Sequence, residues 1–237
     1  MDEDELIVER ILEPEWLDEL PPDDPKAAGS RRDLKRLNGW MGHEALVAEA
    51  LSRYWKNQSL RRIVDLGAGD GTFALGLVRR LVKFQPKLNM LLVDRQPCLG
   101  SKTRDAFQSL GCGVEVAAAD IFDWLAQALV EPGTVFIANL FLHHFHEAEL
   151  CELFYLASQR AALFAACEPR RAKLPLTAAK LVGLIGCNSV TRHDAVVSVQ
   201  AGFTKHELSD MWPAEGEWLL QERAAGLFSH LFVAHRK

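Results

Sequence analysis

The chain has 237 residues, of which 49% are hydrophobic and 25% charged, and its mean hydropathy is −0.03. This composition is ordinary for a soluble globular protein, no apolar run approaches the roughly 18–20 residues that span a bilayer, and the start is too acidic for a secretory signal, so we expect a cytoplasmic protein without membrane insertion. The net charge of −5 argues against nucleic-acid binding, and five cysteines without close pairs predict neither a disulfide framework nor a CxxC metal motif.

Residues 1–55 are predicted to form an N-terminal helical cap. Apolar residues recur every three to four positions from Leu6 to Leu20, which predicts a short amphipathic helix. The proline-rich run 21–25 should break regular structure. Ser30-Arg31-Arg32-Asp33 has the form of a capping box, so a second helix is expected to begin there, and a third is expected over 46–55.

Apolar strands alternate with helices from residue 61 onward. Strands are predicted over 61–66, 88–93, 114–119, 134–139 and 161–167, with helices between them, which indicates a parallel sheet covered on both faces. Two further β-like runs, 217–223 and 228–234, are joined by only four residues, and so short a connection makes an antiparallel hairpin. The predicted fold is therefore α/β, with a seven-stranded, mostly parallel sheet over residues 56–237.

The turn after the first strand, Asp65-Leu66-Gly67-Ala68-Gly69-Asp70-Gly71, is the most informative segment. Glycine is needed where the backbone takes positive φ or where a ligand touches the main chain. Such a turn, at the carboxyl end of a parallel strand, is where open α/β sheets bind nucleotide-like ligands. A dinucleotide fingerprint would place its third glycine at position 72, where this chain has Thr72.

Glycines at 67, 69 and 71 behind an acid resemble the first motif of class I S-adenosylmethionine-dependent methyltransferases, and the C-terminal hairpin is similar to that superfamily's Rossmann-like, seven-stranded layout. The resemblance covers roughly residues 60–237 and implies S-adenosyl-L-methionine as the cofactor, with S-adenosyl-L-homocysteine as product. It implies that Asp65 binds the amine of the cofactor and that the backbone of the glycine turn approaches its methionine part, at Gly67, Ala68, Gly69 and Gly71. It further implies a ribose site at Asp94 and Arg95, an adenine pocket at Asp120, Ile121 and Phe122, and a contact at the fourth strand end, Asn139. Independently of the resemblance, we expect the N-terminal cap to close over the cofactor and to place Asn38 and Met41 near it. Asp94 and Asp120 could instead serve as helix N-caps.

Three histidines are candidate catalytic residues. The segment Asn139–Phe145 is similar to the fourth-strand motif that lines the transfer site of small-molecule methyltransferases, and it contains His143 and His144. His193 lies beside Asp194 in a predicted substrate-side insertion over 172–203. A histidine can act as general base near neutral pH, although these side chains could equally shape the pocket or form a surface turn. No metal is expected, because His143 and His144 cannot easily face one centre in regular structure.

The leading prediction for function is methyl transfer to an oxygen or carbon of a small, aromatic or apolar metabolite. The alignment of nucleophile, methyl group and sulfur would supply most of the rate enhancement. Two alternatives stay open: an RNA or protein methyltransferase, and a catalytically inactive cofactor-binding regulator whose acidic segment 1–25 binds a partner. The expected assembly is a monomer or a homodimer.

Overall fold

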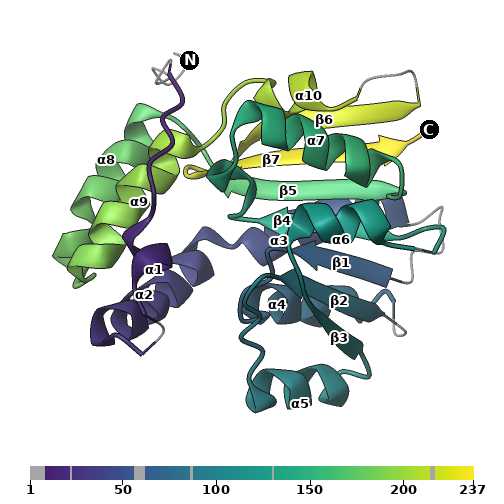
Figure 1. The fold of residues 1–237 in the computed structure, drawn as a ribbon, viewed down its shortest axis with the longest axis horizontal. Helices are drawn as coiled ribbons and strands as arrows, with labels where there is room; N and C mark the ends of the chain where they lie inside the picture. Colours follow the sequence, from purple (N-terminus) through teal and green to yellow (C-terminus); the bar gives the residue numbers. More distant parts are fainter. Residues whose placement is uncertain (1–8, 22, 56–61, 86–87, 130, 214–216) are drawn as a thin grey trace.

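The computed structural model describes residues 9–21, 23–55, 62–85, 88–129, 131–213 and 217–237. Their centre is one seven-stranded sheet (Figure 1). Its strands are β1 (Arg62–Leu66), β2 (Asn89–Asp94), β3 (Gly113–Ala118), β4 (Val135–Asn139), β5 (Leu163–Pro169), β6 (Trp218–Ala225) and β7 (Ser229–Arg236).

The strand order is β3-β2-β1-β4-β5-β7-β6. The first five strands are parallel, whereas β7 runs antiparallel to both β5 and β6. Gly226, with φ of 69°, lies in the tight turn between β6 and β7. The predicted α/β fold with an antiparallel C-terminal hairpin is confirmed.

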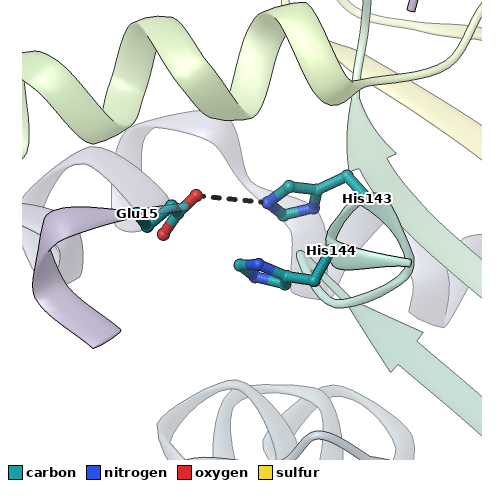
Figure 2. A group of neighbouring side chains, drawn as sticks. All are labelled: Glu15, His143 and His144. Atoms are coloured by element: carbon teal, nitrogen blue, oxygen red, sulfur yellow. Dashed lines mark ion pairs between the residues drawn. The ribbon is translucent and has the colours of Figure 1, made fainter. Parts of the chain in front are cut away.

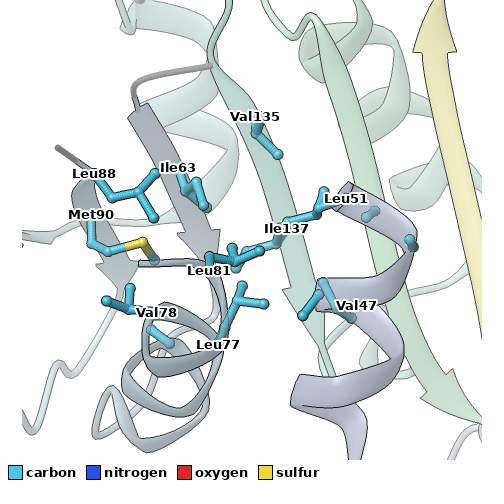
Figure 3. Close-up of a cluster of buried hydrophobic side chains, with 14 of the residues drawn as sticks. Val47, Leu51, Ile63, Leu77, Val78, Leu81, Leu88, Met90, Val135 and Ile137 are labelled. Atoms are coloured by element: carbon cyan, nitrogen blue, oxygen red, sulfur yellow. The ribbon is translucent and has the colours of Figure 1, made fainter. Parts of the chain in front are cut away.

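Helices cover both faces of the sheet. Neighbouring residues of each strand point to opposite sides, so the apolar strands present an apolar surface on each face. Ile63 and its neighbour Val64 belong to two separate cores. One core joins the sheet to α3 (His43–Trp55), α4 (Thr72–Leu81) and α5 (Ser101–Ser109), and Figure 3 shows Val47, Leu77 and Ile137 meeting there. The other core lies under α6 (Ile121–Gln127), α7 (Glu147–Ser158) and α10 (Glu207–Met211).

A second group of helices lies at the left of Figure 1. It joins the N-terminal helices α1 (Trp16–Glu19) and α2 (Pro25–Met41) to α8 (Lys173–Leu181), the 3-10 turn η2 (Val182–Ile185) and α9 (Ser189–Ala201). Helix α9 contacts both α1 and α2. The start of the chain and the insertion therefore pack together. No helix in the described ranges has the length and apolar character needed to cross a membrane.

Two predicted helix boundaries in this group are wrong. Helix α2 begins at Pro25, not at Ser30, because the Asp24 carboxylate accepts a hydrogen bond from the Lys26 amide at 2.6 Å and proline favours the first helical position. Ser30 is buried inside α2, where its hydroxyl accepts a hydrogen bond from Thr191.

The predicted amphipathic helix between Leu6 and Leu20 is only one turn long in the described part of that range. Residues 9–15 are not helical, and α1 begins at Trp16. The Ile11 amide instead donates to the Gln200 carbonyl at 3.2 Å, so this segment satisfies its backbone against α9 rather than within a helix of its own. Residues 1–8 lie outside the described residues.

Candidate functional site

The glycine turn is held against the end of β2. The amides of Gly67 and Ala68 donate to the Val93 carbonyl at 2.9 and 3.2 Å. Gly67, Gly69 and Gly71 all take positive φ, of 73°, 54° and 71°. A Cβ at position 67 would lie 2.1 Å from Phe141 Cδ2, so this turn needs glycine both for its backbone conformation and for the close approach of the β4 loop.

Two buried side-chain oxygens have no hydrogen-bond partner among the described residues: Asp65 Oδ2, at the start of this turn, and Asn38 Oδ1, on α2. Asp65 is 2% exposed, and burial together with the nearby Asp94 raises the pKa of its carboxyl well above the usual range. A buried acceptor without a donor is unfavourable by about 1–3 kcal/mol. Asp65 is therefore suited to receive a cationic or hydrogen-bond-donating ligand.

An ion pair joins the N-terminal helix α2 to the turn. Lys35 Nζ lies 2.6 Å from Asp70 Oδ2, and Asn38 follows one helical turn after Lys35. Met41, the last residue of α2, is half-buried. The cap helix thus approaches the turn through Lys35, and contact of Asn38 and Met41 with a cofactor stays a prediction.

Asp94, at the end of β2, links two loops. Its Oδ2 accepts from the Gly69 amide at 2.8 Å and its Oδ1 from the Gln96 amide at 2.7 Å. It does not cap α5, whose N-cap is Gly100. Its neighbour Arg95 is exposed. The carboxylate stays available at the edge of the sheet for the predicted ribose contact, with its orientation fixed by the glycine turn.

Asp120, at the end of β3, is the N-cap of α6 and accepts from the Phe122 amide at 2.9 Å. The N-cap alternative is therefore observed, and its role at an adenine ring stays a prediction. Ile121 is buried, and the Phe122 ring meets the Phe145 ring edge-on at 5.5 Å. Phe145 in turn packs against Phe141 at 5.0 Å, so aromatic side chains connect the β3 and β4 loops.

Asn139, the last residue of β4, points its side chain toward the core. Its Oδ1 lies 2.7 Å from His43 Nδ1, and His43 Nε2 lies 2.8 Å from Ser229 Oγ. Leu140 follows with φ of 51°, a left-handed conformation that is unfavourable for leucine. Such strain is often found at functional sites, because the surrounding structure has to hold it.

His143 is buried between two carboxylates at the 3-10 turn η1 (Leu142–His144). Its Nδ1 lies 2.8 Å from Glu168 Oε2, and its Nε2 lies 3.5 Å from Glu15 Oε1 (Figure 2). Burial alone would lower the pKa of His143, but the contacts with Glu15 and Glu168 outweigh it and raise that pKa to about 9. Burial of Glu15 is likewise outweighed by His143, which lowers the pKa of Glu15 to about 2.

His144 differs from His143 in exposure and charge. The residue is exposed overall, and its ring centroid lies 4.2 Å from that of the His143 ring. Partial burial of its imidazole and, next, the positive charge of His143 lower the pKa of His144 to about 4. Of the two predicted bases, His144 is therefore the neutral and accessible one, whereas His143 is held as an imidazolium.

Glu15 and Glu168 were not predicted from the sequence. Glu168 is fully buried in β5, and its carboxylate also accepts from the Phe141 and Leu142 amides at 3.0 Å. The sequence could have indicated Glu168, because it is a charged residue at the end of an otherwise apolar strand. The carboxyl ends of parallel strands meet at the edge of the sheet where ligands bind. Glu15 carried no such signal, since tertiary packing alone brings residue 15 to the end of β4.

Residues 9–19, called the strap below, run from α9 to the His143 region. The Arg10 guanidinium donates to the Ala201, His143 and Phe145 carbonyls at 2.7, 3.1 and 3.0 Å. Buried Asp194 accepts from the Trp16 and Leu17 amides at 2.9 and 3.1 Å. The strap is therefore fixed at both ends by residues that are distant in sequence.

His193 contacts the strap rather than the other two histidines. Its ring stacks on Trp16 with centroids 3.9 Å apart, and its Nδ1 lies 3.0 Å from Asp194 Oδ1. Residues 191–194 lie inside α9 and do not form the surface turn that the sequence left open. A catalytic role for His193 stays a prediction.

Replacing Asp194 by alanine is expected to release the strap locally. The substitution leaves the first two amides of α1 without their acceptor, and a lost helix cap is worth about 1–2 kcal/mol. Amide exchange over 16–19 should become roughly 5–30-fold faster by mass spectrometry, with little change over β1–β5. Asp105→Ala, at an exposed position on α5, is the control. Unchanged exchange in the Asp194 variant would show that the strap is held by other contacts.

Comparison with solved structures identifies the architecture. TnmH aligns with 90% of this chain and 57% of its own at 17% identity and a TM-score of 0.54. An O-methyltransferase family protein from Burkholderia thailandensis aligns over 88% and 61% at 16% identity and a TM-score of 0.52. The O-methyltransferase TomG from Streptomyces achromogenes, described in complex with SAM, aligns over 92% of both chains at 14% identity and a TM-score of 0.51.

These likenesses establish the fold of class I S-adenosylmethionine-dependent methyltransferases. The chain spans only 57% and 61% of the lengths of the first two proteins, so their activities are not carried over with the fold. No protein-family model and no curated protein matches the chain.

Proposed function

We propose that this protein binds S-adenosyl-L-methionine and transfers its methyl group to an oxygen or carbon of a small metabolite. One observation carries the proposal: Oδ2 of the buried Asp65 carboxylate lacks a hydrogen-bond partner among the described residues and lies at the start of the glycine turn. The methionine part of the cofactor carries an ammonium group, which would supply both the missing donor and a compensating charge. The class I methyltransferase fold supports this assignment.

Residues around the turn would hold the rest of the cofactor. The glycine backbone at 67–71 would lie along its methionine part, Asp94 would accept from the ribose hydroxyls, and Ile121 and Phe122 would contact the adenine ring. Asn38, with its buried unpaired Oδ1, would approach from α2. The bound cofactor supplies an electrophilic methyl group on a sulfonium sulfur.

The acceptor side would be formed by the β4 loop and the strap. Phe141 and Phe145 offer aromatic surface there, which suits an aromatic or apolar acceptor. His144 is neutral and exposed, so it could accept a proton from an acceptor hydroxyl, but its lowered pKa makes it a weak base. Most of the rate enhancement would therefore come from the packing of the loop, which orients the nucleophile. His143 and Glu168 would position the loop that carries His144.

The test is a two-stage measurement on the full chain. Calorimetry with S-adenosyl-L-homocysteine should show one binding site, and a screen of small aromatic and apolar metabolites with methyl-labelled cofactor should show transfer to an oxygen or carbon. Absence of cofactor binding would overturn the proposal. Cofactor binding with label transferred only to RNA or protein would overturn the acceptor class.

Replacing Asp94 by alanine is expected to weaken S-adenosyl-L-homocysteine binding by about a hundredfold. The change removes the acceptor for the ribose hydroxyls and also the partner of the Gly69 amide, and each charge-assisted bond is worth about 1.5–3 kcal/mol. Calorimetry measures the affinity, with Asp105→Ala, at an exposed position on α5, as the control. Wild-type affinity in the Asp94 variant would contradict the ribose assignment.

A further inference from the structure

We propose that Glu15, His143 and His144 form a binding site for one divalent transition-metal ion, with zinc(II) the ion that suits this ligand set best. Each residue offers one donor atom, and the three atoms lie within 4.8 Å of one another (Figure 2). Two donors bound to one tetrahedral zinc ion at about 2.1 Å each are about 3.4 Å apart. A donor separation of 4.8 Å would have to shorten by about 1.4 Å, so side-chain movements of roughly 1 Å or less at each residue would bring all three onto a single ion.

The composition of the cluster is that of known zinc sites. Two imidazole nitrogens and one carboxylate oxygen are a common set of three protein ligands, and such sites keep a further position open for water or substrate. His144 is exposed, so the cluster is accessible from solvent. If the proposed methyl transfer is right, the open position would face the acceptor and could bind its oxygen, and the ion would then take the place of His144 as the group that activates the acceptor hydroxyl.

The surroundings of His143 resemble a second coordination shell. Metal-binding histidines usually donate their other ring nitrogen to a carboxylate or carbonyl, which fixes the tautomer and the ring orientation. Glu168, fully buried, lies 2.8 Å from His143 Nδ1 and leaves Nε2 directed toward Glu15. A bound ion would replace the proton on Nε2, so metal binding at this histidine would release a proton. Ser198 Oγ donates to Glu15 Oε1, the oxygen that also faces His143, so a hydrogen bond helps to fix the orientation of this second ligand.

The structure removes the reason for expecting no metal. Adjacent histidines on a strand point to opposite faces, but residues 142–144 form a 3-10 turn, and the two rings lie 4.2 Å apart with only 33° between their planes. The third ligand comes from the strap, which is more than 120 residues away in sequence. An ion at this position would also connect the strap to the end of β4.

The experiment titrates cobalt(II) and zinc(II) into the untagged, chelator-treated full chain without cofactor. Cys98 and Cys151 are exposed thiols, so both are replaced by serine in every sample. Cobalt should give visible absorption bands at a stoichiometry of one, and calorimetry with zinc should give a dissociation constant of micromolar or tighter. The variants are Glu15→Gln and His144→Asn, with His206→Ala, an exposed histidine at the start of α10, as the matched control.

We expect Glu15→Gln and His144→Asn each to weaken metal binding at least tenfold, and Glu168→Gln to weaken it by roughly 10–100-fold as an outer-shell change. The control should bind like the parent. Absence of stoichiometric binding, or equal affinity in all variants, would overturn the proposal and leave Glu15 and His143 as an ion pair alone. Because the titration uses no cofactor, its failure leaves the methyltransferase proposal intact, and failure of methyl transfer leaves the metal site intact.

Discussion

Replacing Gly67 by alanine is expected to lower the free energy of unfolding by roughly 2–5 kcal/mol and to weaken cofactor binding. Position 67 has φ of 73°, where a side chain is unfavourable by about 1–2 kcal/mol. The new Cβ would also lie 2.1 Å from Phe141 Cδ2, and overpacking of this kind typically adds about 1–3 kcal/mol. Phe141 would have to leave its edge-on contact with Phe145, which displaces the β4 loop.

The variant Gly69→Ala separates the effect of backbone strain from the effect of the steric collision with Phe141. Position 69 also has positive φ, of 54°, but a Cβ there would meet no described atom within 4 Å. Thermal unfolding should therefore show a clearly larger fall in Tm for Gly67→Ala than for Gly69→Ala. The double variant Gly67→Ala/Phe141→Ala should be more stable than the two single effects predict, because the collision is absent. Equal losses at positions 67 and 69 would contradict the role of Phe141.

The fold was predictable because its signal is local. Each strand of the sheet carries an apolar run, and every predicted strand overlaps the observed one within about two residues. The four-residue connection before β7 was enough to predict an antiparallel hairpin, since no parallel crossover fits. The positive φ at positions 67, 69 and 71 was likewise predictable, because glycine is the residue type that favours it.

The surroundings of the site were less predictable because tertiary contacts determine them. The capping-box pattern at Ser30 predicted the start of α2 too late, because Asp24 caps the helix and Pro25 is its first residue. The Ser30 hydroxyl instead accepts a hydrogen bond from Thr191. Residues 9–15 have helical periodicity, but they are not helical, and the Ile11 amide bonds the Gln200 carbonyl of α9 instead. The grouping of Glu15 with His143 depends on that same packing, so no local pattern could indicate it.

Replacing Asp65 by asparagine is expected to stabilise the free protein near neutral pH and to weaken S-adenosyl-L-homocysteine binding by roughly 10–100-fold. Burial and the nearby Asp94 raise the pKa of Asp65, so the folded state binds this proton more tightly than the unfolded state. Stability from this group is present below the unfolded pKa and is lost as pH rises toward the folded pKa. The Asp65→Asn variant has no charge to bury at this position. Its Tm should therefore exceed that of the wild type at pH values above the folded-state pKa of Asp65.

Folding favours the protonated form of Asp65, whereas cofactor binding should favour the ionised form. An ammonium group favours the ionised carboxylate, so wild-type affinity should rise with pH until the raised pKa of Asp65 is passed and then level off. Calorimetry in two buffers of different ionisation enthalpy would count the proton released on binding. Asp120→Asn is the matched control, because asparagine caps α6 as well as aspartate does and should keep the wild-type pH profile.

Asp65→Asn tests the proposed function because it should change two quantities in opposite directions: stability should rise and cofactor affinity should fall. A purely structural carboxylate would give a stability change without altering the pH dependence of affinity, and a surface carboxylate would give neither effect. If Asp65→Asn binds S-adenosyl-L-homocysteine with the same affinity and pH profile as the wild type, the buried unpaired Oδ2 does not receive the cofactor's ammonium group. The observation that carries the proposed function would then point to a different ligand at the glycine turn.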